Sequence, residues 1–147
     1  MKGEQGFHHY YEDIFGSRWE GLRDGLRGEP AYLEVNRGLL QPYYMDLASV
    51  VAASLLPLPA QGAVLDMCAA PGGKTLVLAR RLFGGAEVGG ATEGANLRLV
   101  ANERSSGRRA RLHRVLKEHL PEESLEYVSV TGHDGTKWGL YEQEAYD

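Results

Sequence analysis

AVLDMCAAPGGKT, residues 63–75, sets the architecture of the chain, and the rest of the sequence is best understood outward from it. Ala63–Met67 is a short apolar run, typical of a buried parallel strand. Cys68–Gly73 predicts a loop of small residues, which let a ligand approach the backbone, and Thr75–Phe83 has the apolar spacing of a helix. Because a helix start presents unpaired N–H groups and Lys74 adds a positive charge, this loop predicts a ligand site.

Strands and helices alternate after this loop. The apolar patterns predict a strand at Leu97–Asn102, a helix at Ser105–Leu120 and a strand at Leu125–Thr131 that ends in the turn Gly132–Gly135. A further helix is expected before the loop, at Asp46–Leu56. This order predicts an α/β fold with a parallel sheet and right-handed crossovers, which binds ligands at the carboxyl ends of its strands.

The ends of the chain have a different character. Residues 1–46 predict a helical N-terminal segment, and residues 47–147 the first half of a larger domain, because three strands would leave an open edge. Gly28 and Pro30 end the N-terminal helix. The glycine-rich Gly84–Asn96 predicts a flexible surface loop, and Trp138–Asp147 has no clear pattern. The N-terminal helix is indicated by apolar residues that recur at spacings of three and four: Tyr11, Phe15, Trp19, Leu22 and Leu26.

Composition narrows the classes of protein. The chain has 147 residues and a formal net charge of −4, so as a whole it is not built to bind a polyanion. A single cysteine excludes an internal disulfide framework and a cysteine-rich zinc site. No secretory signal and no membrane-spanning run are found, so we expect no membrane partner, no metal and a reducing compartment: the cytoplasm or, in a eukaryote, the mitochondrion.

Two other interpretations of the loop remain open on the residues alone. A nucleotide phosphate loop also ends in Gly-Lys-Thr, but it needs a glycine five positions before Gly73, where this chain has Cys68, and Pro71 removes one N–H. The loop could also simply connect a strand to a helix.

The string Asp66–Thr75 resembles the first methyltransferase motif of the Nop/Sun (RsmB-like) family of RNA cytosine-5 methyltransferases. The similarity extends to Leu40–Leu56, Asn102–Leu120 and Ser129–Gly139. The residues at 102–108 and 134–139 resemble most those of the branch that methylates mitochondrial small-subunit ribosomal RNA. The resemblance implies a Rossmann-like S-adenosylmethionine-dependent methyltransferase fold, here truncated behind the helical segment. It also implies S-adenosylmethionine as cofactor and RNA, ribosomal RNA in particular, as partner.

The resemblance also implies a set of cofactor-binding residues. Glu103 follows the second predicted strand, where adenosine-binding sheets place a carboxylate for the ribose, although the family has aspartate there and an acid favoured at a helix start is the alternative. Glu87 and Glu93 lie nearer the usual spacing but have no strand before them. Asp66 fits either the methionine amino group of the cofactor or a capping role. The implied cofactor-binding residues are Cys68, Ala69, Ala70, Pro71, Gly72, Gly73, Lys74, Glu103, Arg108, Asp134 and Gly135.

Three of these positions have ordinary structural alternatives. Asp134, which would accept from the adenine amino group, is also a common turn residue between Gly132 and Gly135. Arg108, which matches a cofactor-contacting arginine, could be a solvated helix residue. The crowded basic residues of 104–117 could bind RNA phosphates, but a solvated helix face is favoured slightly.

The chemistry of cytosine-C5 transfer needs a thiolate that attacks C6 and a base that later removes the C5 proton. The resemblance places the catalytic cysteines in later motifs, so we expect no catalytic residue here and expect them downstream of Asp147. The predicted function is S-adenosylmethionine-dependent RNA cytosine-C5 methylation, this chain carrying the cofactor part. The alternatives are a non-catalytic cofactor- or RNA-binding fragment and a nucleotide-dependent phosphotransferase.

Overall fold

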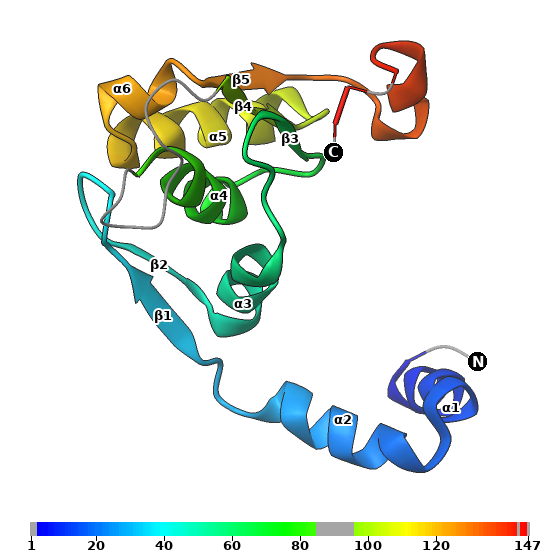
Figure 1. The fold of residues 1–147 in the computed structure, drawn as a ribbon. Coiled ribbons are helices and arrows are strands. Elements are labelled where there is room, and N and C mark those ends of the chain that lie inside the picture. The colour runs from blue at the N-terminus through cyan, green and yellow to red at the C-terminus, as the bar shows by residue number, and fades with distance from the viewer. Residues whose placement is uncertain (1–2, 85–95, 144, 147) are drawn as a thin grey trace. The chain divides into compact units, whose positions relative to one another are not determined.

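The computed structural model describes residues 3–84, 96–143 and 145–146 and divides into two compact units, Met1–Ala31 and Tyr32–Asp147 (Figure 1). The predicted loop Gly84–Asn96 therefore lies, apart from its two end residues, outside the described residues. The predicted division into residues 1–46 and 47–147 stays a prediction.

The first unit is a broken helix. Instead of the single amphipathic helix predicted, α1 (Glu4–Phe15), the 3-10 turn η1 (Gly16–Arg18) and α2 (Trp19–Arg27) follow one another. The break falls at Gly16, whose φ of 55° is readily adopted only by glycine. Trp19 is buried, stacks on Tyr11 and donates from Nε1 to His8 Nδ1 at 3.1 Å. The apolar spacing thus indicated the residues that pack together but not the break.

The second unit begins with a hairpin that the sequence did not predict. β1 (Tyr32–Val35) pairs antiparallel with β2 (Tyr43–Asp46), in a stretch that we expected to be helical. Aromatic and branched side chains favour this pairing, because they pack well on a pleated surface. The predicted helix follows as α3 (Leu47–Leu55), with Asp46 as its N-cap: the carboxylate accepts from Ser49 N at 3.1 Å.

The parallel sheet is confirmed. Within the described residues, β3 (Gly62–Asp66), β4 (Leu97–Asn102) and β5 (Val128–Thr131) pair in that order, and both pairs are parallel. The helices α4 (Gly73–Phe83) and α5 (Ser106–His119) fall between the strands in sequence.

The third strand is shorter than predicted. Residues 122–125 form the short helix α6 (Glu122–Leu125), and the strand begins only at Val128. Pro121 stands at the helix N-cap and two glutamates fill the first turn, which favours a helix start over a strand. The 3-10 segment η3 (Gly135–Leu140) follows β5 and is the last helical element among the described residues.

Helix α4 is the centre of the core. Figure 1 shows it between the strands on one side and α3 with the hairpin on the other. Leu76 and Ala79 belong to the main apolar cluster with strand and α5 side chains, whereas Val77 packs with Val35, Met45 and Ala53. Packing on both sides places this helix in the interior, and the glycine loop enters it at its N-terminus.

Candidate functional site

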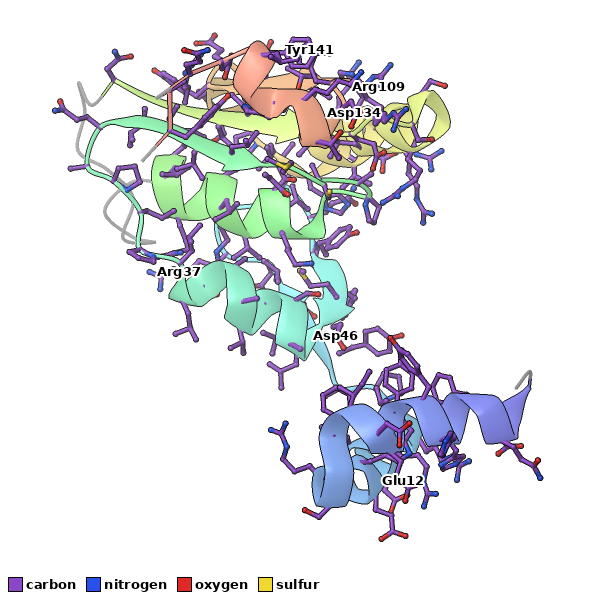
Figure 2. The ribbon with its side chains drawn as sticks, turned by 90° about the vertical axis from the view of Figure 1, so that its right-hand side faces the viewer. Glu12, Arg37, Asp46, Arg109, Asp134 and Tyr141 are labelled. Carbon is purple, nitrogen blue, oxygen red and sulfur yellow. The ribbon has the colours of Figure 1, made fainter. Side chains whose placement is uncertain are left out.

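The structure brings the predicted site residues to one edge of the sheet. The glycine loop follows β3, Glu103 follows β4 and Asp134 comes three residues after the end of β5. Because the three strands are parallel, these positions all lie at the carboxyl ends of the strands, where open α/β sheets bind ligands. Figure 2 shows Asp134 at this edge, close to Arg109 of α5.

The two glycines of the loop lie close to side chains of other elements. A Cβ on Gly72, which has a φ of +124°, would lie 2.9 Å from Val115 Cγ1 of α5. A Cβ on Gly73 would lie 3.0 Å from Met45 Cε of the hairpin. The sequence predicts that small residues here admit a ligand to the backbone; at these two positions, side chains from two other elements lie against the backbone instead.

Asp66 ends β3 and turns inward to the loop. Its carboxylate accepts a hydrogen bond from Thr75 Oγ1 at 2.7 Å, which ties the end of the strand to the first turn of α4. Burial raises the pKa of Asp66, while the Thr75 hydrogen bond and the nearby Lys74 work in the opposite direction. The Asp66 carboxylate thus bonds to a side-chain hydroxyl of α4, and the N-cap of this helix is Gly72. A capping role and a contact with the methionine amino group both stay predictions.

Lys74 faces the hairpin side of the loop. Its Nζ lies 3.4 Å from Ser49 Oγ, at the start of α3. A cavity of about 150 Å³ opens here, and the exposed thiol of Cys68 contributes to its wall. The other lining residues come from the hairpin, α3 and the loop: Tyr43, Met45, Ser49, Ala69, Ala70, Pro71, Gly73 and Lys74.

Glu103 is buried although it carries a charge. One carboxylate oxygen accepts from Ser105 N at 2.8 Å, and the other lies 3.2 Å from Arg108 Nη2. The same Arg108 nitrogen donates to Ala70 O at 3.1 Å. Glu103 therefore accepts a hydrogen bond at the start of α5, in line with the alternative of an acid favoured at a helix start. Arg108 is an exposed helix residue, yet its guanidinium joins the glycine loop to the carboxylate after β4.

Asp134 forms a turn and an ion pair. One oxygen accepts from the Thr136 hydroxyl at 2.8 Å and from Thr136 N at 3.1 Å, and the other lies 3.3 Å from Arg104 Nη1. These hydrogen bonds, led by that of the Thr136 hydroxyl, lower the pKa of Asp134. A Cβ on Gly135 would lie 3.1 Å from Met67 Sδ, so the backbone after Asp134 passes close to the residue that follows β3.

Sequence reasoning missed Asn102 and Arg109. Asn102, the last residue of β4, is buried and bonded to chain segments after β3 and β5. Arg109 Nη1 donates to Glu103 O at 2.8 Å, and a Cβ on Gly132 would come within 2.7 Å of its Cζ. Asn102 could have been noticed in the sequence as a polar residue at the end of a largely apolar strand. Arg109 had no signal of its own among the many arginines of α5.

Two exclusions apply to the part of the chain that the structure describes. Its histidine, cysteine and acidic side chains include no group of three that could hold a metal ion. Its helices include none with the length and apolar character needed to cross a membrane.

Known proteins were compared with the chain. No protein-family model matches it. Over 126 residues, 84% of the chain, it is 40% identical to the 5-cytosine rRNA methyltransferase NSUN4 of Bos taurus, and equally to that of Mus musculus. It is 36% identical over 115 residues to the mitochondrial tRNA (cytosine(34)-C(5))-methyltransferase of Danio rerio. The chain spans only 27–30% of the length of these relatives.

A solved structure shows the same fold. The crystal structure of PH0851 matches 96% of the chain and 39% of its own length with a TM-score of 0.63, at 18% sequence identity. This match confirms the predicted Rossmann-like architecture. The 40% identity to rRNA cytosine-5 methyltransferases over 84% of the chain shows that the chain belongs to the RNA cytosine-5 methyltransferase family that its glycine loop resembles.

Proposed function

We propose that the strand-end edge binds S-adenosylmethionine and that the chain is the cofactor-binding part of a methyltransferase acting on cytosine C5 of ribosomal RNA. The observation that carries the proposal is the convergence of the glycine loop, Glu103 and Asp134 at one edge of a parallel sheet. Family membership supplies the reaction and argues against the phosphate-loop alternative.

The side chains at this edge fit an adenosine. Glu103 offers carboxylate oxygens for the ribose hydroxyls, since each oxygen can accept more than the one contact it has in the protein. Asp134 offers an acceptor to the adenine amino group, and the half-exposed Met67 offers an apolar surface beside Gly135. The loop Cys68–Lys74 would hold the methionine end. The cofactor, when bound, supplies the methyl group as an electrophile.

The substrate follows from the relatives. The most similar ones reported above act on rRNA by name, and a more distant one acts on tRNA. We therefore propose ribosomal RNA as the substrate and, for a eukaryotic source, the mitochondrion as the location. We assign no catalytic role to Cys68, because it lies within the proposed cofactor loop; the nucleophile would come from later motifs of the family.

Calorimetric titration tests the cofactor. We expect S-adenosylhomocysteine to bind to the 147-residue chain and magnesium-ATP to bind at least about tenfold more weakly, since the site offers acceptors to an adenosine but no glycine at Cys68 for a phosphate cradle. Tight binding of magnesium-ATP without any S-adenosylhomocysteine signal would refute the proposal.

One alternative has an observation in its favour. Arg111, Arg114 and Lys117 are exposed on α5 and take part in no ion pair found among the described residues. These charges fit a non-catalytic RNA-binding fragment as well as an enzyme. Binding of an RNA oligonucleotide that weakens steeply with salt, without any S-adenosylhomocysteine binding, would favour this alternative.

A further inference from the structure

One buried side chain joins all three strand ends. Asn102 is 2% exposed, and its Nδ2 donates to Met67 O and to His133 O, both at 3.1 Å. Its Oδ1 accepts from His133 N at 2.8 Å and from Thr131 Oγ1 at 2.9 Å. An amide has two N–H donors and an oxygen with two lone pairs, so the hydrogen-bonding capacity of Asn102 is fully used.

The orientation of this amide is fixed by its partners. Turning it by 180° would set its N–H groups against the N–H of His133 and its oxygen against two carbonyls. Only one orientation therefore satisfies the network. A buried amide with four good partners is rigid, and losing it leaves several backbone groups unpaired.

The side chain of Asn102 links the three strands just past the last residues that pair through the backbone. The last paired residues are Asp66 with Ala101 and Asn102 with Thr131. Beyond these pairs, the Asn102 side chain bonds to Met67 on one side and to His133 on the other. Its backbone O also accepts from Ala69 N at 2.9 Å.

The residues that Asn102 holds adjoin the proposed cofactor contacts. Met67 precedes Cys68, His133 precedes Asp134, and Asn102 itself precedes Glu103. We propose that Asn102 is the positioning residue of the site, whose amide sets the spacing at which the glycine loop, Glu103 and Asp134 can engage one ligand. This inference rests on the proposed function for the ligand, but its geometric part does not.

The geometric part is tested without ligand, by amide hydrogen exchange followed by NMR. In Asn102→Ser we expect the amides of Ala69 and His133 to exchange at least about tenfold faster, while those of Leu99 and Ala101 change by less than about threefold. Thr131→Val removes a single hydrogen bond and should give the same pattern at smaller amplitude, whereas Thr131→Ser should restore it. Acceleration spread evenly over the sheet, or no acceleration, would overturn the proposal.

The functional part is tested by a double-mutant cycle on S-adenosylhomocysteine affinity. Glu103→Gln should weaken binding by about tenfold in the wild-type background and by less than about twofold in Thr131→Val or Asn102→Ser. In these two backgrounds the carboxylate is already displaced from the ligand, so removing its charge changes the affinity little. Additive effects would overturn the positioning role. If the wild-type chain binds no S-adenosylhomocysteine, the proposed function fails, and the exchange experiment alone decides the inference.

Discussion

The two sides of the candidate site are held by different forces. The glycine loop is held by apolar packing: Gly72 is closed in by Val115 of α5, and Gly73 by Met45 of the hairpin. The acidic side is held by polar contacts. Asn102 and Arg108 donate hydrogen bonds to backbone carbonyls, and Glu103 accepts one from Ser105 N at the start of α5. Both sides face one edge of the sheet, and hydrogen bonds from Arg108 Nη2 to Ala70 O and from Asn102 Nδ2 to Met67 O run between them.

This difference has a practical consequence. A side chain added at Gly72 meets Val115 and needs a backbone conformation that residues other than glycine rarely adopt, so the cost appears in the stability of the fold. A charge removed from the acidic side leaves the shape intact, so the cost appears in ligand binding and in its dependence on pH. Substitutions on the two sides should therefore give distinguishable results.

The largest effect is expected from Gly72→Ala. The new Cβ would lie 2.9 Å from Val115 Cγ1, at a φ of +124° that alanine rarely adopts. We expect a loss of about 2–4 kcal/mol in the free energy of unfolding, measured by urea denaturation. The matched control is Gly107→Ala in α5, where a Cβ meets nothing within 4 Å. Equal midpoints for the two variants would show that the loop is not held by packing.

The next effect is expected from Glu103→Gln, in ligand binding. The substitution keeps the size of the side chain and removes the charge that strengthens hydrogen bonds from ribose hydroxyls and from Ser105 N. S-adenosylhomocysteine affinity, measured by calorimetry, should fall by roughly 1–3 kcal/mol. The exposed Glu126→Gln changes net charge equally and should leave affinity unaltered. An unchanged affinity in Glu103→Gln would reduce Glu103 to a helix-capping residue.

A smaller effect concerns Asp66 and pH. Burial raises the pKa of Asp66 above its ordinary value of 3.8, so the folded chain holds this proton more tightly than the unfolded chain does. The stability contributed by this group is complete below pH 3.8 and is lost as the pH rises through the folded pKa.

Asp66→Asn keeps an acceptor for Thr75 and cannot ionise. Over that pH window, its unfolding free energy should rise relative to that of the wild type as the pH increases. A difference between the two proteins that stays constant with pH would contradict a raised pKa. Urea denaturation at a series of pH values provides the measurement.

The smallest effect is expected from Cys68→Ser. The thiol is exposed, and the substitution preserves a small side chain in the loop, so S-adenosylhomocysteine affinity should stay within about twofold. An affinity that falls well beyond this range would show that the thiol contacts the ligand.

Cys68 is also the single cysteine of the 147 residues. Incubating the chain with labelled S-adenosylmethionine and ribosomal RNA should therefore give no 5-methylcytosine above background, because the usual nucleophile is a second thiol. Incorporation that depends on Cys68 would contradict this assignment.

Much of the fold was predictable because its signals are local. The strand–loop–helix order around residues 62–83 and the limits of β4 follow from apolar periodicity and turn residues. The errors fall where two local patterns compete. Leu125 fits the alternation of a strand, yet Pro121 and two acids begin a helix there. The aromatic stretch 32–46 pairs with itself as a hairpin, a contact that no periodicity within one element can reveal.

The candidate site was predictable in its members and only partly in their contacts. Glu103 and Asp134 could be placed at strand ends by counting elements. The hydrogen bond from Arg108 to Ala70 O, 38 residues earlier in the chain, could not be predicted in this way, because side-chain partners depend on how α5 lies over the loop.

The sequence by itself determined the strand–helix–strand–helix order of residues 62–119, the loop at Cys68–Gly73 and the family, since these depend on residues that are neighbours along the chain. Only the tertiary structure decided why Gly72 must be glycine and what Asn102 does. Both answers come from contacts between segments far apart in sequence: Asn102 bonds to Met67 over 35 residues. Such contacts arise only when the chain is packed, because packing alone sets which buried groups must find partners.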